Sequence, residues 1–132
     1  MRPLLTVDDD PEIRRIIRLG LAADYSVFEA WDKASALAAF RDAKPGIILL
    51  DLNLPDCDGI ELLEALKAAG SDAFVIMLTG IEDLEAARRS LELGADEYIT
   101  KPFDMEYLKG VLRDRAGRRE PNGDRPPWRV GE

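Results

Sequence analysis

Short apolar runs alternate along this chain with segments in which apolar residues recur at helical spacing. The runs occupy residues 4–7, 25–30, 47–50, 74–78 and 98–99. The helical segments cover residues 11–23, about 34–40, about 60–70, about 82–93 and about 108–112. A helix between two strands returns the chain to the end of the sheet from which the next strand can run parallel to the last. The alternation therefore predicts an α/β fold built on a five-stranded parallel sheet.

The polarity of the runs also predicts their order in the sheet. Runs one, three and four are apolar stretches in which Thr6 is the single polar residue, as expected of central strands that are covered on both faces. Runs two and five include or adjoin polar residues, namely Ser26, Glu29, Asp96 and Glu97. We therefore place these two runs at the edges, which gives the order 2-1-3-4-5 of a doubly wound, flavodoxin-like (βα)5 sheet. The switch point of that sheet lies between strands one and three.

The length of 132 residues suits one domain. Residues 1–116 carry the alternating pattern, whereas residues 117–132, GRREPNGDRPPWRVGE, shift to Gly, Pro and Arg without periodicity. We predict a domain at 1–116 and a flexible tail, or the stub of a linker, at 117–132. The apolar stretches are shorter than a membrane span and no signal peptide precedes the first run, so we expect a cytoplasmic protein.

Charge and composition exclude several classes of function. The net charge of -8 argues against direct nucleic-acid binding or membrane binding by this domain, because phosphate backbones and anionic lipids attract basic patches. The single cysteine, Cys57, lies between Asp56 and Asp58, which we predict to be solvated turn residues and which disfavour a catalytic thiolate. The chain has no histidine, which excludes Ser/His and Cys/His nucleophile pairs, His-ligated zinc and an internal phosphohistidine.

Carboxylates follow two of the predicted central strands. Asp8 and Asp9 end the run at 4–7, and Asp51 ends the run at 47–50. Because parallel strands end at the same edge of a sheet, we expect these three acids to converge. Their mutual repulsion requires a cation nearby, and carboxylate and carbonyl oxygens are the ligands that Mg²⁺ prefers.

A carboxylate beside such a cation can attack a phosphorus centre and form an acyl phosphate. Asp51 is the better candidate for this nucleophile because it stands alone, whereas the paired acids after the first run suit metal binding. Thr79 and Lys101 follow the fourth and fifth runs. They can give a hydrogen bond and a positive charge to phosphoryl oxygens, and Gly80 leaves room beside them.

Four motifs carry a resemblance to a known family. They are LLTVDDD at residues 4–10, LLDLNLPDCDG at 49–59, MLTG at 77–80 and GADEYITKPF at 94–103. In this order and spacing they resemble the receiver (CheY-like) domain of two-component response regulators over nearly the whole of residues 1–116. In that family, the aspartate that ends the third strand accepts a phosphoryl group from a phosphohistidine on a partner kinase.

The resemblance implies a role for each acid. Asp51 is implied as the phosphorylated residue. Asp9, Asp51 and the main-chain carbonyl of Asn53 are implied as direct ligands of Mg²⁺, and Asp8 is implied to hold a metal-bound water. The implied partners are a sensor histidine kinase or phosphotransfer protein, together with a downstream protein or an appended output domain.

The resemblance also implies a switch. A phosphoryl group would draw the Thr79 hydroxyl inward, and the Tyr98 ring would fill the vacated space. The surface of the helix at 82–93, the strand at 98–99 and the last helix would then change, and its charges are compatible with a symmetric homodimer. The Lys101–Pro102 peptide is implied to be cis. Taken singly, Thr79 suits an ordinary strand end, Tyr98 edge-strand packing and Lys101 a solvated surface.

Three classes of function follow from these observations. The first is a stand-alone phosphoryl-accepting switch that binds a partner protein, and the second is the receiver of a longer DNA-binding transcriptional regulator. The third is a Mg²⁺-dependent phosphatase, but such enzymes typically place a second aspartate two positions after the nucleophile, where this chain has Asn53. Flavin or dinucleotide binding is disfavoured because the loop after the first strand lacks glycine. We expect a signalling switch and no turnover of an external substrate.

Overall fold

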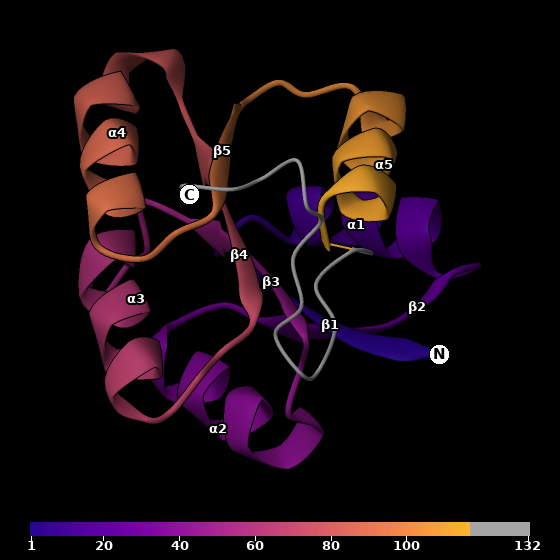
Figure 1. The fold of residues 1–132 in the computed structure, drawn as a ribbon, viewed down its shortest axis with the longest axis horizontal. Coiled ribbons are helices and arrows are strands. Elements are labelled where there is room, and N and C mark those ends of the chain that lie inside the picture. The colour runs from indigo at the N-terminus through magenta and orange to yellow at the C-terminus, as the bar shows by residue number, and fades with distance from the viewer. Residues whose placement is uncertain (117–132) are drawn as a thin grey trace, which may run out of the picture. The chain divides into compact units, whose positions relative to one another are not determined.

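The computed structural model describes residues 1–116, in which five strands alternate with five α-helices (Figure 1). The strands are β1 (Arg2–Val7), β2 (Tyr25–Ala30), β3 (Ile47–Asp51), β4 (Phe74–Thr79) and β5 (Glu97–Thr100). The helices are α1 (Pro11–Leu21), α2 (Lys33–Ala43), α3 (Gly59–Ala68), α4 (Leu84–Glu92) and α5 (Met105–Asp114), and a 3₁₀ turn, η1 (Ile81–Asp83), precedes α4. None of the helices described is long and apolar enough to cross a membrane.

All five strands lie in one parallel sheet in the order β2-β1-β3-β4-β5, which confirms the predicted order. Helix α1 lies on one face of the sheet, and α2, α3 and α4 lie on the other (Figure 1). The central strand β3 is buried along its whole length. Alternate residues of β1, β3 and β4 pack with α2, α3 and α4 in one apolar cluster, which fixes the sheet against these helices.

Residues Met1–Pro102 form one compact unit that holds the whole sheet, and α5 belongs to a second unit that begins at Phe103. In α5 the Asp104 side chain accepts a hydrogen bond of 2.8 Å from the Glu106 N–H, which caps the helix. The single domain expected at 1–116 stays a prediction. Residues 117–132, where we predict a tail or linker stub, lie outside the described residues.

Aspartate side chains begin four of the five described helices, because the first amides of a helix have no partner within it. The capping residues are Asp10, Asp32, Asp58 and Asp104. Asp58 is exposed, as predicted, but it also caps α3, since its carboxylate accepts a 2.7 Å hydrogen bond from the Glu61 N–H. The Asp56 carboxylate accepts a hydrogen bond of 3.2 Å from the main-chain N–H of Lys33.

Two helix boundaries differ from the prediction. Helix α1 ends at Leu21, because the Asp24 N–H turns back to the Leu21 carbonyl (3.1 Å) and leads into β2. The helix predicted from residue 82 starts as the 3₁₀ turn η1, in which the Asp83 N–H donates to the Gly80 carbonyl at 3.0 Å. The turn places residues 81–83 directly beside the end of β4.

Candidate functional site

The sheet register brings the predicted site residues to one edge. Asp8 and Asp51 are the residues that follow the last β1–β3 pair, Val7 with Leu50, and Asp9 follows Asp8. The neighbouring strand β4 ends at Thr79, and β5 leads directly to Lys101. Parallel strands that end together therefore gather three acids, a hydroxyl and an ammonium at their carboxyl ends.

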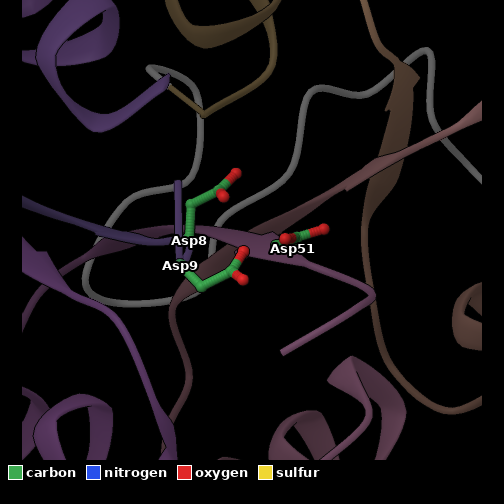
Figure 2. Close-up of side chains that lie close together, drawn as sticks. All are labelled: Asp8, Asp9 and Asp51. Carbon is green, nitrogen blue, oxygen red and sulfur yellow. The ribbon is translucent and has the colours of Figure 1, made fainter. Parts of the chain in front are cut away.

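The three acids converge as predicted (Figure 2). One carboxylate oxygen from each of Asp8, Asp9 and Asp51 lies within 4.8 Å of the other two. The exposed fractions of Asp8 and Asp51 are only 1% and 5%, whereas Asp9 is exposed. Oxygen donors at this spacing, two of them buried and one open to solvent, fit a divalent metal ion that keeps part of its water shell.

Lys101 provides the positive charge within this cluster. Its ammonium lies 2.9 Å from an Asp8 carboxylate oxygen and 3.4 Å from an Asp51 oxygen. The Lys101–Pro102 peptide is cis, as the resemblance implies. One lysine therefore bridges the two buried acids and offsets part of their repulsion.

The cluster changes the proton affinity of its members. Burial, followed by the charge of Asp8, raises the pKa of Asp51 from 3.8 to about 6, although Lys101 and the Asn53 N–H act in the opposite direction. Burial by itself disfavours the Lys101 ammonium, but its hydrogen bond to Asp8 and the charge of Asp51 outweigh this and raise the pKa of Lys101. The ammonium is thus held in its charged form beside a carboxylate that is destabilised by burial.

Backbone amides hold the two buried carboxylates in place. The Asp10 N–H donates to Asp8 Oδ1 at 2.9 Å, and the Asn53 N–H donates to Asp51 Oδ1 at 3.2 Å. Each acid therefore closes a small turn with the residue two positions later, which fixes its side-chain direction. The second turn also brings the main chain of Asn53, the implied carbonyl ligand, beside Asp51.

Thr79 and Tyr98, the implied switch pair, lie on adjacent strands. Thr79 is fully buried, and its hydroxyl donates to the Gly80 carbonyl at 3.1 Å. Tyr98 pairs with Met77 in the sheet, and its partly buried side chain packs against the apolar cluster. The switch role of these two residues stays a prediction.

Two glycines shape the loops around the acids. A side chain at Gly80 would collide with the Glu82 carboxylate, which lies close against this glycine. The room for a phosphoryl group beside Gly80 stays a prediction. At Gly59 a Cβ would come within 2.7 Å of the Leu52 Cα, and the Gly59 N–H donates to the Leu52 carbonyl at 2.6 Å. The loop after β3 therefore folds back onto the strand end that carries Asp51, at a distance only glycine permits.

Two contacts of the site were not predicted from sequence. The Asn53 side-chain amide donates to an Asp83 carboxylate oxygen at 2.9 Å, which links the loop after β3 to η1. The Arg14 guanidinium donates to the Asp8 main-chain carbonyl at 2.7 Å, which links α1 to the end of β1. The first pair is separated by 30 residues, and neither contact belongs to a local motif. No pattern in a single sequence indicates them.

The single cysteine lies in the same loop as Asn53. Burial, together with the charges of Asp56 and Glu61, raises the pKa of the Cys57 thiol to about 11. The thiol is therefore protonated at neutral pH, in agreement with the prediction that it is not a nucleophile.

Comparison with known proteins decides the family. The family model for the response regulator receiver domain matches residues 4–113. The chain belongs to this family. It is 39% identical over 114 residues to the transcriptional regulatory protein KdpE of Mycobacterium tuberculosis, an alignment that covers 86% of this chain and 50% of the relative. It is also 39% identical over 133 residues to the phosphate regulon transcriptional regulatory protein PhoB of Pseudomonas aeruginosa, covering 98% of this chain and 58% of the relative.

Solved receiver structures have the same fold. A CheY-like response regulator receiver domain protein of Methanospirillum hungatei superimposes with a TM-score of 0.85 at 32% identity, covering 93% of this chain and 99% of that chain. The flavodoxin-like fold and the family resemblance are thereby confirmed. This receiver spans about half the length of the curated relatives that it matches.

Proposed function

We propose that this receiver is a phosphoryl-accepting signalling switch in a two-component system, with Asp51 as the acceptor. The supporting observation is the cluster itself: a buried carboxylate at the end of the central strand, two further acids within 4.8 Å and a lysine ammonium 3.4 Å away. Receiver domains of response regulators are phosphorylated by histidine kinases, so the proposed donor is a phosphohistidine on a sensor kinase or phosphotransfer protein. The chain has no histidine of its own.

In the proposed step an Asp51 carboxylate oxygen attacks the phosphorus of the phosphohistidine. The oxygen–phosphorus bond forms as the nitrogen–phosphorus bond breaks, and the imidazole leaves with a proton from solvent. Lys101 lies close enough to Asp51 to move its ammonium onto a phosphoryl oxygen of the product. A divalent ion held by Asp9, Asp51 and the main-chain carbonyl of Asn53, with Asp8 on a metal-bound water, would neutralise phosphoryl charge when bound. We propose Mg²⁺ because every donor is oxygen.

The new charge on Asp51 is proposed to act through Thr79. Its hydroxyl now donates to the Gly80 carbonyl and can instead donate to a phosphoryl oxygen, which would let the Tyr98 ring turn inward. The proposed output elements are α4, β5 and α5, which would bind a downstream protein or a second copy of the chain. Phosphorylation can shift the equilibrium between the outward and inward arrangements of Thr79 and Tyr98 only as far as the phosphoryl group interacts more favourably with one of them.

The experiment is phosphorylation by a small donor. The 132-residue chain is incubated with acetyl phosphate and MgCl₂, and its intact mass is compared with that of Asp51→Asn. We expect the wild type to gain one phosphoryl group and the variant to gain none, with EDTA abolishing the gain. A wild type that stays unmodified, or an Asp51→Asn variant that is modified equally, would refute the assignment.

A second candidate is the receiver part of a longer transcriptional regulator. It is favoured by the length comparison, since the receiver spans about half of relatives that are named as transcriptional regulators. The test is the intact mass of the protein purified from its native source: a mass well above 14.7 kDa supports the longer regulator, and 14.7 kDa contradicts it. A phosphatase is not favoured, because the amide of Asn53, bonded to Asp83, stands where a general acid would be needed.

A further inference from the structure

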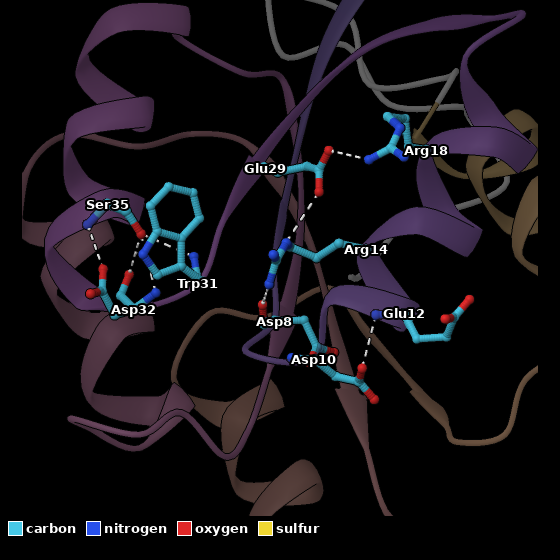
Figure 3. A network of polar contacts seen from close by, with 9 residues as sticks. All are labelled: Asp8, Asp10, Glu12, Arg14, Arg18, Glu29, Trp31, Asp32 and Ser35. Carbon is cyan, nitrogen blue, oxygen red and sulfur yellow. Dashed lines mark hydrogen bonds and ion pairs between the residues drawn. The ribbon is translucent and has the colours of Figure 1, made fainter.

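Arg14 of α1 connects three separate parts of the receiver (Figure 3). Its Nη1 donates to the main-chain carbonyl of Asp8 at 2.7 Å, and its Nε lies 3.1 Å from a Glu29 oxygen on β2. Its guanidinium also lies 5.7 Å from the centroid of the Trp31 ring. Only 16% of the Arg14 side chain is exposed. Arg14 is therefore held by three groups at once, whereas an arginine on the surface of a helix is usually solvated.

The partners of Arg14 are themselves held in place. The second carboxylate oxygen of Glu29 accepts from Arg18 at 2.6 Å, so Glu29 is fixed from both sides. The main-chain N–H of Trp31 donates to the Ser35 hydroxyl at 2.9 Å, next to the capping box of Asp32 and Ser35 that begins α2. The planar guanidinium therefore has its orientation set before any ligand binds, which a flexible lysine would not achieve.

The carbonyl that Arg14 binds belongs to the peptide that joins Asp8 to Asp9. The Asp8 N–H still takes part in the sheet, where it donates to the Ala30 carbonyl at 3.0 Å. Its carbonyl points beyond the last pair of the sheet and is taken by the guanidinium. Rotation of this peptide would change the direction in which the exposed Asp9 side chain leaves the backbone. Arg14 thus sets the geometry of one acid relative to the two buried ones.

We propose that Arg14 is a positioning residue for the cation of the acid cluster, acting through the Asp8 carbonyl. This inference rests on the proposed Mg²⁺ site. If only its charge mattered, removal of Arg14 would strengthen cation binding, because loss of a positive charge near three carboxylates increases their attraction for a cation. If position dominates, removal of Arg14 weakens binding, roughly tenfold, as is usual for residues that orient metal ligands.

The test measures Mg²⁺ affinity of the full 132-residue chain by titration with MgCl₂, following the amide NMR signals of residues 8–10 and 51–53. We expect Arg14→Ala to raise the dissociation constant of Mg²⁺ roughly tenfold. Arg14→Lys should raise it severalfold, since lysine keeps the charge but lacks the planar set of N–H donors. Arg18→Ala is the matched control: it removes the same charge from the same Glu29 without touching Asp8. We expect its affinity to stay within about twofold of wild type.

Folding is checked for each variant in EDTA by its amide spectrum. If Arg14→Ala fails to fold, Arg14→Lys carries the test, because it keeps the charge: electrostatics alone predicts an unchanged affinity, whereas loss of the planar guanidinium predicts a weaker one. Equal or tighter binding by the Arg14 variants, or full affinity in Arg14→Lys, would overturn the positioning role while leaving the Mg²⁺ site intact. A wild type without saturable Mg²⁺ shifts would overturn the proposed function itself.

Discussion

Replacement of Asp51 by asparagine removes one negative charge from the acid cluster and keeps the shape of the side chain. Burial and the charge of Asp8 raise the pKa of Asp51 from 3.8 to about 6, so the ionised form of this side chain destabilises the folded receiver. A shift of about two pH units corresponds to about 3 kcal/mol at about 1.4 kcal/mol per unit. The amide must still find partners beside Lys101, so we expect Asp51→Asn to raise the unfolding free energy by about 1–3 kcal/mol at neutral pH without metal.

The sign of the pH dependence follows from the direction of the shift. Between the unfolded pKa of 3.8 and the folded value of about 6, the folded state binds more protons than the unfolded state. The stability of the wild type therefore falls as the pH rises through this window, relative to Asp51→Asn. The gain of the variant should be near zero below about pH 4 and reach its full size above about pH 6.

Urea unfolding in EDTA, followed by circular dichroism at several pH values, measures this difference. Asp72→Asn, which neutralises an exposed acid, serves as control and should change stability by less than about 0.5 kcal/mol. Saturating MgCl₂ should stabilise the wild type more than Asp51→Asn, because one ligand is lost. An Asp51→Asn variant that is less stable than wild type at neutral pH, or a gain that is equal at pH 4 and pH 7, would refute the reasoning.

Four further predictions concern single residues. Lys101→Met leaves two buried acids without their cation and should lower the unfolding free energy by about 3–5 kcal/mol in EDTA, with partial recovery in MgCl₂, both measured by urea unfolding. Gly59→Ala places a Cβ 2.7 Å from the Leu52 Cα and should lower the unfolding free energy by about 1–3 kcal/mol. Gly110 lies in the interior of α5, where a Cβ would be 3.8 Å from the nearest atom of the Arg113 side chain. Gly110→Ala should therefore raise the unfolding free energy by about 0.5–1 kcal/mol, and thermal melts measure both changes. Thr6→Val should stabilise by about 1 kcal/mol, because the buried Thr6 hydroxyl finds no hydrogen-bond partner within residues 1–116; a lower melting temperature would contradict this.

The parts of this receiver that were predictable from sequence are those set by local patterns. Apolar runs, broken only by Thr6 in β1, identify β1, β3 and β4 as central strands because both of their faces are covered, and the strand order follows. The convergence of Asp8, Asp9 and Asp51 then needs no further information, since parallel strands end at one edge. The cap at Asp10 is likewise a local pattern, since an acid stands directly before the proline that begins α1.

Other features depended on packing that no local pattern records. The 3₁₀ turn before α4 arises where the chain leaves β4, and helical periodicity does not distinguish it from a first α-helical turn. The Asp58 cap was missed although its signal was present, since Glu61 follows three residues later, as in a capping box. The contact between Asn53 and Asp83 joins loops that only the folded sheet brings together.

The residues of the acid cluster are positioned by neighbours on two sides. Toward α1 and β2, Arg14 holds the carbonyl of Asp8. Toward α4, the loop that carries Asn53 is tied to Asp83 at the start of that helix. A charge placed on Asp51 would act on a carboxylate that burial already destabilises, in a cluster held by these two contacts. The link toward α1 includes the ion pair between Arg14 and Glu29, whereas the link toward α4 is a single hydrogen bond from an amide to a carboxylate, so added salt should weaken the link toward α1 more.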